Sequence, residues 1–366
     1  VWILGEEPFW PKSLGGFSLR GAYGRSSTAP NPFIDVQRYF GGSPPLDGPR
    51  GGVPEPESNA EWEMGLDAAL FGGRLTVELT RYVQTTANAL VAVTVDGESI
   101  PRRLELQNVG KLRNHGLEVQ VAAAVVTEPG WAVDVGLGLA TNRSKVLDLG
   151  GTDTFNDQSS HFLVGYPAPA SRGKMVAAPD AINGPWALDR YATDLDGSDL
   201  LPLGSQLPTR FLTPSVTVRM PGGITLAARG EYRGGNIRNV SPVPVGRSVR
   251  SPLCYPYYVD PSSSIELKAD TPDLWRERCT PTAGADYWFS ADFFKLRSVT
   301  AAVPLGFAVP SGTFTVSLAN ALTWYKDVPW WDVEIPGNDG ANGDGVSSAD
   351  RVPASTTITF GIRVEF

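Results

Sequence analysis

The amino-acid sequence predicts an all-β fold in which long antiparallel strands form part of a transmembrane β-barrel. Apolar and polar residues alternate with period two from one end of the 366-residue chain to the other. The alternating segments run to about nine to eleven residues, the length that a tilted strand needs to cross a hydrocarbon layer. Soluble strands average nearer five or six residues, so strand length favours a barrel over a β-sandwich.

The strands can be followed along the chain by this alternation. Near residue 131, for example, Trp131 and Val133 face one way while Ala132 and Asp134 face the other. We expect about ten or eleven strands on this pattern. These strands are drawn from the segments 16–24, 61–70, 75–80, 117–125, 131–139, 224–229, 314–318 and 357–366, and from segments near 86–95, 102–111, 209–219 and 287–303.

The connections between these segments fall into two size classes. Tight, glycine-rich turns are expected at 71–74, 127–130 and 221–223. Long polar stretches rich in glycine and proline cover 25–58, 147–208, 234–286 and 326–355. Outer-membrane barrels combine short periplasmic turns with long extracellular loops. The long stretches are therefore expected on the extracellular side.

The composition excludes several classes of protein. The net charge of −8 gives no basic face for nucleic acid. No run approaches 18 apolar residues, so no transmembrane helix is expected. The chain starts at Val1 with no signal-peptide pattern, which indicates a processed chain or a fragment.

Two cysteines, Cys254 and Cys279, lie in the same predicted loop. They are either two unrelated thiols or a disulfide that closes this loop, and we favour the disulfide. Two cysteines without a nearby histidine do not make a zinc site.

Residues suited to catalysis or to cofactor binding are few. His115 is expected in a turn and His161 in a long loop, and no motif of a hydrolase, metalloprotease or nucleotide-binding loop is present. Acidic runs at 194–199 and 338–345 could ligate Ca²⁺, but their spacing favours solvated turns. We expect no cofactor and no enzymatic activity.

Several segments, in order, resemble the C-terminal half of SusC/RagA-type TonB-linked outer-membrane proteins. They are 19–26, 61–67, 71–75, 291–297 and 359–366, together with a block containing Asn108, Gly110, Asn114, Gly116 and Glu118. That block looks like the family's N-x-G-x-x-x-N-x-G-x-E motif. Its asparagine and glycine residues suit a strand-to-strand turn with positive φ.

The resemblance implies that residues 1–366 are the C-terminal part of a 22-strand barrel, whose plug and N-terminal domains are absent from this chain. It implies import of a glycan or peptide nutrient across the outer membrane of a Gram-negative bacterium. The expected partners are the TonB–ExbB–ExbD system, acting through the missing region, and a SusD-like lipoprotein. Lipid and lipopolysaccharide would surround the barrel, and the barrel-assembly machinery would read a closing strand with Phe360, Ile362, Val364 and Phe366.

Two other classes of function remain open from the sequence. One is a small outer-membrane enzyme barrel with carboxylates on its loops. The other is a soluble β-sandwich that acts as an adhesin or lectin.

Overall fold

The fold is described from a computed structural model of the chain. The structure describes residues 1–11, 15–29, 55–95, 103–150, 155–156, 161–173, 175–182, 201–239, 252–262, 266–279, 288–306, 312–327, 332–334 and 354–364.

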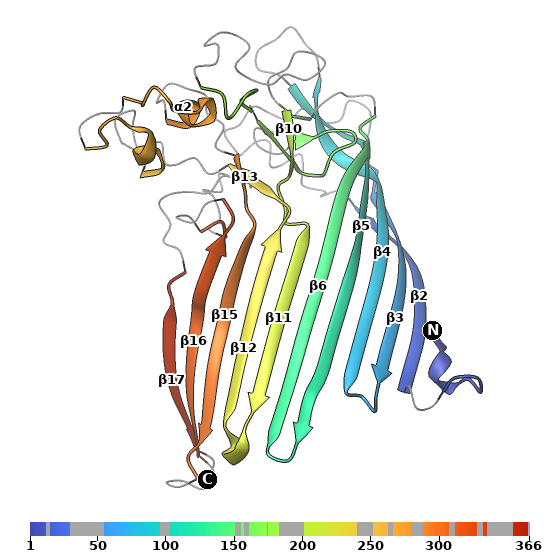
Figure 1. The fold of residues 1–366 in the computed structure, drawn as a ribbon. Helices are drawn as coiled ribbons and strands as arrows, with labels where there is room; N and C mark the ends of the chain where they lie inside the picture. The colour runs from blue at the N-terminus through green and yellow to red at the C-terminus, as the bar shows by residue number, and fades with distance from the viewer. Residues whose placement is uncertain are drawn as a thin grey trace.

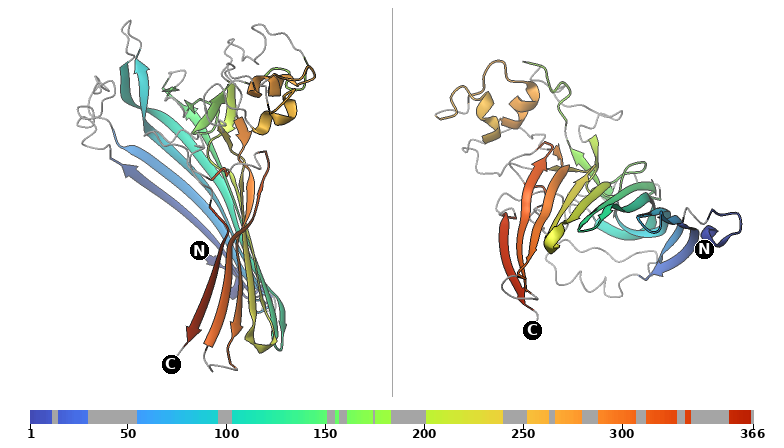
Figure 2. Two further views of the ribbon diagram at one scale, coloured as in Figure 1. Left: turned by 90° about the vertical axis from the view of Figure 1, so that its left-hand side faces the viewer. Right: turned by 60° about the horizontal axis from the view of Figure 1, so that its bottom comes forward.

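A single antiparallel sheet of eleven strands dominates the described part of the chain (Figure 1). Its strands follow the order β1-β2-β3-β4-β5-β6-β11-β12-β15-β16-β17, so each pairs with its neighbour along the chain once the small elements between them are set aside. The bounds are β1 Trp2–Ile3, β2 Gly15–Thr28, β3 Glu57–Leu70, β4 Leu75–Val95, β5 Arg103–Glu128, β6 Trp131–Asp148, β11 Arg210–Arg219, β12 Thr225–Gly234, β15 Phe293–Pro304, β16 Gly312–Tyr325 and β17 Thr357–Val364. The sheet is twisted and open, with β1 and β17 at its two edges (Figure 2). An open sheet of such strands is the form expected for part of a larger barrel.

The two ends of the sheet differ in the length of their connections, as the sequence predicts. The end called here the turn end carries the tight turns after β3, β5 and β11, where Gly72, Gly130 and Gly222 have positive φ. The 3-10 helix η4 (Pro221–Gly223) forms the last of these turns. The opposite end, called the loop end, carries the described parts of the long connections that follow β6 and β12, at the top of Figure 1.

Small elements gather at the loop end. Strands β7 (Phe155–Asn156), β8 (His161–Phe162), β9 (Ala170–Gly173) and β10 (Leu201–Ser205) form a four-stranded sheet. Strands β13 (Ile237–Asn239) and β14 (Trp288–Ser290) form a two-stranded one. The 3-10 helix η5 (Pro252–Tyr257) and helix α2 (Asp273–Cys279) lie beside them, and η1 (Leu4–Glu6) follows β1 near the other edge of the large sheet. No described helix is long and apolar enough to cross a membrane.

Buried apolar clusters lie near the loop end rather than on the strands in the middle of the sheet. One contains Phe289, Ala291, Phe293 and Val333, and the other Cys254, Tyr258 and Cys279. Large side chains on the sheet are instead exposed, and Trp62 at 58% and Ile362 at 68% are examples. Exposed apolar surface of this extent marks a face that meets lipid or another protein.

Two strands each join segments that the alternation predicts as separate. Segments 75–80 and 86–95 form one strand, β4, of 21 residues, and 102–111 and 117–125 form one strand, β5, of 26 residues. The β4–β5 register shifts between Thr86 and Ala89, and Asn88 there has a φ of 57°. A bulge changes the phase of the alternation without ending the strand. The predicted separate strands were therefore wrong.

Candidate functional site

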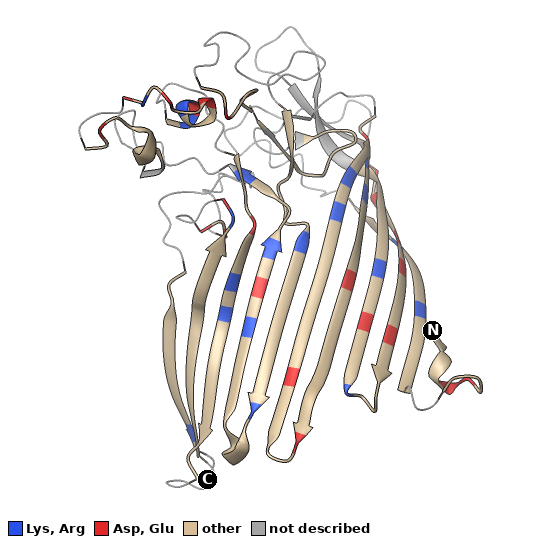
Figure 3. Cartoon of the chain, in the orientation of Figure 1, with Lys and Arg blue, Asp and Glu red and all other residues tan. Residues whose placement is uncertain are grey.

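One face of the sheet, called here the polar face, aligns hydrogen-bonding and charged side chains from neighbouring strands. Directly opposed residues of antiparallel strands share a face, so the register defines rows that cross the sheet. One row holds Ser18, Asp67, Glu78 and Gln120, and the next holds Arg20, Gly65, Thr80 and Glu118. The opposite face, called the apolar face, carries Leu19, Leu66, Leu79 and Val119 between those rows. Figure 3 shows charged residues at intervals along the strands.

Two adjoining hollows lie in the middle of the polar face. Their volumes are about 260 Å³ and about 500 Å³, and Glu78, Gln120, Gly138 and Thr213 line both. The lining joins carboxylates to neutral amide and hydroxyl groups. The side chains of this face therefore border a concave, water-accessible surface.

A polar contact crosses three strands beside these hollows. The Arg20 guanidinium lies 3.2 Å from Asp67 Oδ2 and donates to Thr80 Oγ1 at 2.5 Å. Gly65 lies in the same row, and a Cβ added there would come within 2.5 Å of Arg20 Nε. The missing side chain at position 65 thus leaves the space through which Arg20 reaches β4.

A second, more buried group of charges joins the polar face to a segment that follows β16. Lys295 Nζ donates to both carboxylate oxygens of Asp332 at 2.8 Å, and its side chain is only 3% exposed. Lys295 also donates to Glu334, which accepts from Arg297. Arg297 donates in turn to Glu231 at 2.6 Å. Residues 332–334 are thereby fixed on the strands β12 and β15.

Each cation of this network is paired with carboxylates of the same network. Burial acts to raise the pKa of Glu334, but hydrogen bonds from Arg297 and Lys295 hold that pKa below its ordinary value. An ionised carboxylate that already accepts from two cations is poorly placed to act as a general base. The network therefore has a structural role, which is to anchor a connecting segment.

A third hollow, of about 270 Å³, lies nearer the loop end. From the strands it is lined by neutral polar side chains, and from the 147–208 connection by residues of β10 and its surroundings. The strand residues are Tyr82, Gln84, Asn114, Asn142 and Ser144. The backbone N–H of Ala168 donates to Ser144 Oγ at 3.3 Å, which ties that connection to the sheet. Amides and hydroxyls beside an aromatic ring suit a polar, uncharged ligand.

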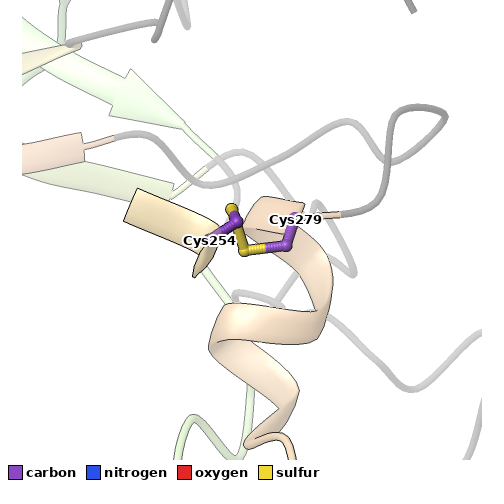
Figure 4. The surroundings of a disulfide bond; sticks show 2 residues. All are labelled: Cys254 and Cys279. Carbon is purple, nitrogen blue, oxygen red and sulfur yellow. A yellow bond between two sulfur atoms is a disulfide. The ribbon is translucent and has the colours of Figure 1, made fainter. Parts of the chain in front are cut away.

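A disulfide joins η5 to α2 at the loop end (Figure 4). It links Cys254 to Cys279, the pair that the sequence suggested. Trp275 of α2 stacks on Tyr257 with ring centroids 4.8 Å apart, and the guanidinium of Arg278 lies 5.2 Å from the Trp275 ring. The covalent link and the stacked rings hold a short helical unit together within a long connection.

The block that includes Asn108 does not form a turn, and this prediction was wrong. All of it lies inside β5, where Gly110 pairs with Ala89 of β4. Asn108 donates to the carbonyl of Asn88, the residue with positive φ in the β4 bulge, at 2.9 Å. Further along β5, Asn114 donates to Gln84, Tyr82 lies over Gly116, and Glu118 lines the first hollow. The block therefore supports β4–β5 pairing and contributes polar-face side chains.

The remaining predicted residues are placed as follows. Phe360 and Ile362 lie on the apolar face of β17, where Phe360 stacks on Phe314, while Val364 pairs with Gly312. Phe366 and the acidic runs 194–199 and 338–345 lie outside the described residues. His115 lies in β5 rather than in a turn, and His161 begins β8.

Comparison with known proteins identifies relatives of one kind. A family model described as "TonB dependent receptor-like, beta-barrel" matches residues 12–233, more than half of the chain. TonB-dependent receptor P26 of Formosa agariphila is 30% identical over 169 residues, which are 42% of this chain and 17% of that protein. TonB-dependent receptor SusC of Bacteroides thetaiotaomicron is 26% identical over 97 residues, which are 26% of this chain and 10% of that protein. The matches therefore span only a small part of each relative.

The fold is similar to that of two solved structures. The RagAB peptide transporter superposes with a TM-score of 0.66 at 16% identity, covering 98% of this chain and 42% of that one. The RagAB peptide importer in its open-open state gives a TM-score of 0.69 at 15% identity, covering 98% and 41%. At this identity the likeness concerns the fold. Almost all of this chain thus matches less than half of each of these longer chains.

Proposed function

This chain belongs to the TonB-dependent receptor-like β-barrel family, and we propose that it forms the C-terminal part of the barrel wall of a nutrient importer. The family resides in the outer membrane of Gram-negative bacteria, and we place this protein there. One observation carries the proposal, namely an open sheet with an exposed apolar face on one side and a hollowed polar face on the other.

The two faces suggest how the wall works. Lipid-facing and lumen-facing residues alternate along barrel strands, so the apolar face would meet lipid and the polar face would line the lumen. The charges of Asp67, Glu78 and Glu118 then lie in water, where they need no neutralisation. On the opposite register each would be destabilising at the midplane, by less than the roughly 2–4 kcal/mol that a lysine or arginine costs there.

The substrate we propose is a glycan or a peptide. The hollow near the loop end offers Gln84, Asn114 and Asn142 as neutral hydrogen-bonding groups, with Tyr82 beside them. Such groups match the hydroxyls of a sugar or the amides of a peptide chain. The name of the RagAB peptide importer, whose fold is similar, is consistent with the peptide class. The chain itself would perform no covalent chemistry.

The partners we propose follow from the family. A SusD-like lipoprotein would cover the loop end, and the TonB–ExbB–ExbD system would act through a region of the complete protein outside residues 1–366. The barrel-assembly machinery would insert the protein into a membrane of lipid and lipopolysaccharide. The small sheet β7–β10 and the disulfide-linked unit would then face the lipoprotein.

A pair of cysteine variants tests the two faces in intact cells. Gln120→Cys puts a thiol on the polar face, and Leu137→Cys puts one on the apolar face of the next strand, where Leu137 is 42% exposed. A charged, membrane-impermeant thiol reagent should label Gln120→Cys and slow nutrient uptake. Leu137→Cys should stay unlabelled because lipid covers it.

Different outcomes separate the alternatives. Equal labelling at both positions would indicate a soluble protein, as in an adhesin or lectin. Labelling of Gln120→Cys alone with unchanged uptake would retain the barrel and refute this route of transport. If the purified protein converts the nutrient into a product, the enzyme barrel would be favoured.

A further inference from the structure

A cluster of cations lies on the apolar face, where the alternation of a barrel strand calls for apolar residues. We call it the basic patch, and it consists of Arg81 in β4, Arg113 in β5, Arg143 and Lys145 in β6, and Arg210 in β11. The register fixes their face, because Arg81 opposes Leu117, which opposes Thr141, which opposes Arg210. In the rows above, His115 opposes Arg143 and Arg113 opposes Lys145. All five cations are exposed.

The patch is compact. Its four strands are neighbours in the sheet and span about 14 Å at about 4.8 Å per strand. Its three rows are two residues apart and cover about 13 Å along the strands. Five cations in that area can meet two or more phosphate groups at once. Arginine, which makes up four of them, binds phosphate oxygens with two parallel hydrogen bonds.

The part of the chain that the structure describes leaves most of this charge without a carboxylate partner. Among the described residues, Arg81, Arg113 and Arg143 take part in no ion pair, and neither does Lys145. Arg210 lies 3.3 Å from Asp292. No aspartate or glutamate of the described strands lies on the apolar face around the patch. This holds for the paired residues of β2–β6 and β11 in the rows that run from Val119 to Arg113. The five cations of the patch, and Arg25 of β2 in the row of Arg113, therefore face outward with a single carboxylate among them.

The surroundings of the patch set its depth in the membrane. On the side toward the turn end lies a band of exposed aliphatic residues, which includes Leu137 and Leu139. In the row of Arg143 lie Tyr23 and Trp62, with ring centroids 4.5 Å apart. On the other flank Trp324 is 51% exposed. Tyrosine and tryptophan gather at the boundary between lipid tails and headgroups. A lipid-facing cation is unfavourable at the midplane and tolerated near the interface, so these cations lie at headgroup depth.

We propose that the basic patch binds a lipid of the outer leaflet that carries two or more phosphate groups. The argument rests on the proposed membrane location, since only there does the apolar face meet lipid. The acyl chains would lie on the aliphatic band, and the phosphates would reach the guanidinium and ammonium groups above it. Such a lipid would remain bound as an annulus against β4, β5, β6 and β11.

A binding experiment on the full-length protein in detergent micelles tests this proposal. The probe is fluorescent diphosphorylated lipid A, titrated into the parent protein and into the triple variant Arg113→Gln/Arg143→Gln/Lys145→Gln. Each cation near an anionic headgroup strengthens binding roughly fivefold, so the triple variant should bind on the order of 100-fold more weakly. The matched control, Arg219→Gln/Arg229→Gln/Arg363→Gln, removes three cations from the polar face and should bind like the parent.

The outcomes are separable. Equal affinity of the patch variant and the control would overturn the proposal. Displacement of the probe by inorganic phosphate at low millimolar concentration would also overturn it, because the site would then bind free anions. If the triple variant does not fold, the single changes Arg113→Gln and Lys145→Gln should each weaken binding about fivefold. A protein that passes the thiol-labelling test and binds lipid A without the patch would leave the proposed transport intact.

Discussion

Replacement of Lys295 by methionine should destabilise the protein far more than removal of any exposed cation. Its ammonium lies 2.8 Å from both oxygens of Asp332 and contacts Glu334, and its side chain is 3% exposed. At 2.8 Å and an effective dielectric of about 20, one such charge pair attracts by roughly 6 kcal/mol before desolvation is subtracted. Loss of one partner of a buried pair typically costs about 3–5 kcal/mol, because the other charge is left buried alone.

Arg219→Met is the matched control. Arg219 lies at the same 2.8 Å from Asp134, but the two side chains are 59% and 39% exposed. Water screens that pair, so its loss should cost about 0.2–1 kcal/mol. The assay is denaturant unfolding of the full-length protein in detergent, with hydrogen exchange at residues 332–334 as a local readout. Equal losses for the two variants would refute the reasoning, and so would unchanged exchange at 332–334 in Lys295→Met.

Three further predictions follow from the same structure. Cys254→Ser should destabilise the disulfide-linked unit by about 3.5 kcal/mol, from the chain entropy of a 25-residue separation. Proteolysis within 252–279 should then accelerate, and reductant should have the same effect on the parent. Gly116→Ala should lower the free energy of unfolding by roughly 1–3 kcal/mol, because the added Cβ would lie 2.1 Å from the backbone oxygen of Thr141. In the control Gly361→Ala the added Cβ meets nothing within 4 Å, so the free energy of unfolding should not change. The pKa of Glu334 is lowered in the folded protein, so the ionised carboxylate contributes its full stabilisation at neutral pH, and this stabilisation is lost as pH falls below about 4.3 and through the folded pKa. The difference in unfolding free energy between parent and Glu334→Gln should therefore shrink from pH 6 to pH 3. A difference that stays constant over this range would contradict the prediction.

Alternation and turn chemistry predicted the parts of the fold that depend on local sequence. Strand β6 keeps an unbroken alternation over 131–139, and the tight turns begin and end where their glycines indicate. The alternation predicts the wrong strand boundaries in β4 and β5, because one extra residue at a bulge reverses the face that the following residues occupy. The pattern then looks like two short strands separated by a turn.

The block in β5 that was predicted to form a turn carries a strand signal in its spacing. Asn108, Gly110, Asn114, Gly116 and Glu118 are all separated by even numbers of residues. Even spacing places residues on one face of a strand, whereas a turn would not require it. The even spacing therefore predicts a strand, whereas the residue types alone predict a turn.

Other features had no local signal. Lys295 contacts Asp332 across 37 residues of chain, and neither position is unusual in its own segment. The basic patch is similar, because its cations come from four strands and only the register brings them together. Arg81, Arg113 and Arg143 each occupy a position that the pattern reserves for apolar residues, but nothing in their own segments shows that they meet.

The length of β5 has a mechanical consequence. Its 26 residues span about 85 Å, which at a tilt of about 45° gives a rise of roughly 60 Å. The hydrocarbon layer is only about 30 Å thick. Much of the β4–β5 strand pair must then extend beyond the bilayer as a stiff, hydrogen-bonded structure. A force applied at the loop end of these two strands would be transmitted to the membrane-embedded part of the sheet, because hydrogen-bonded strands bend little.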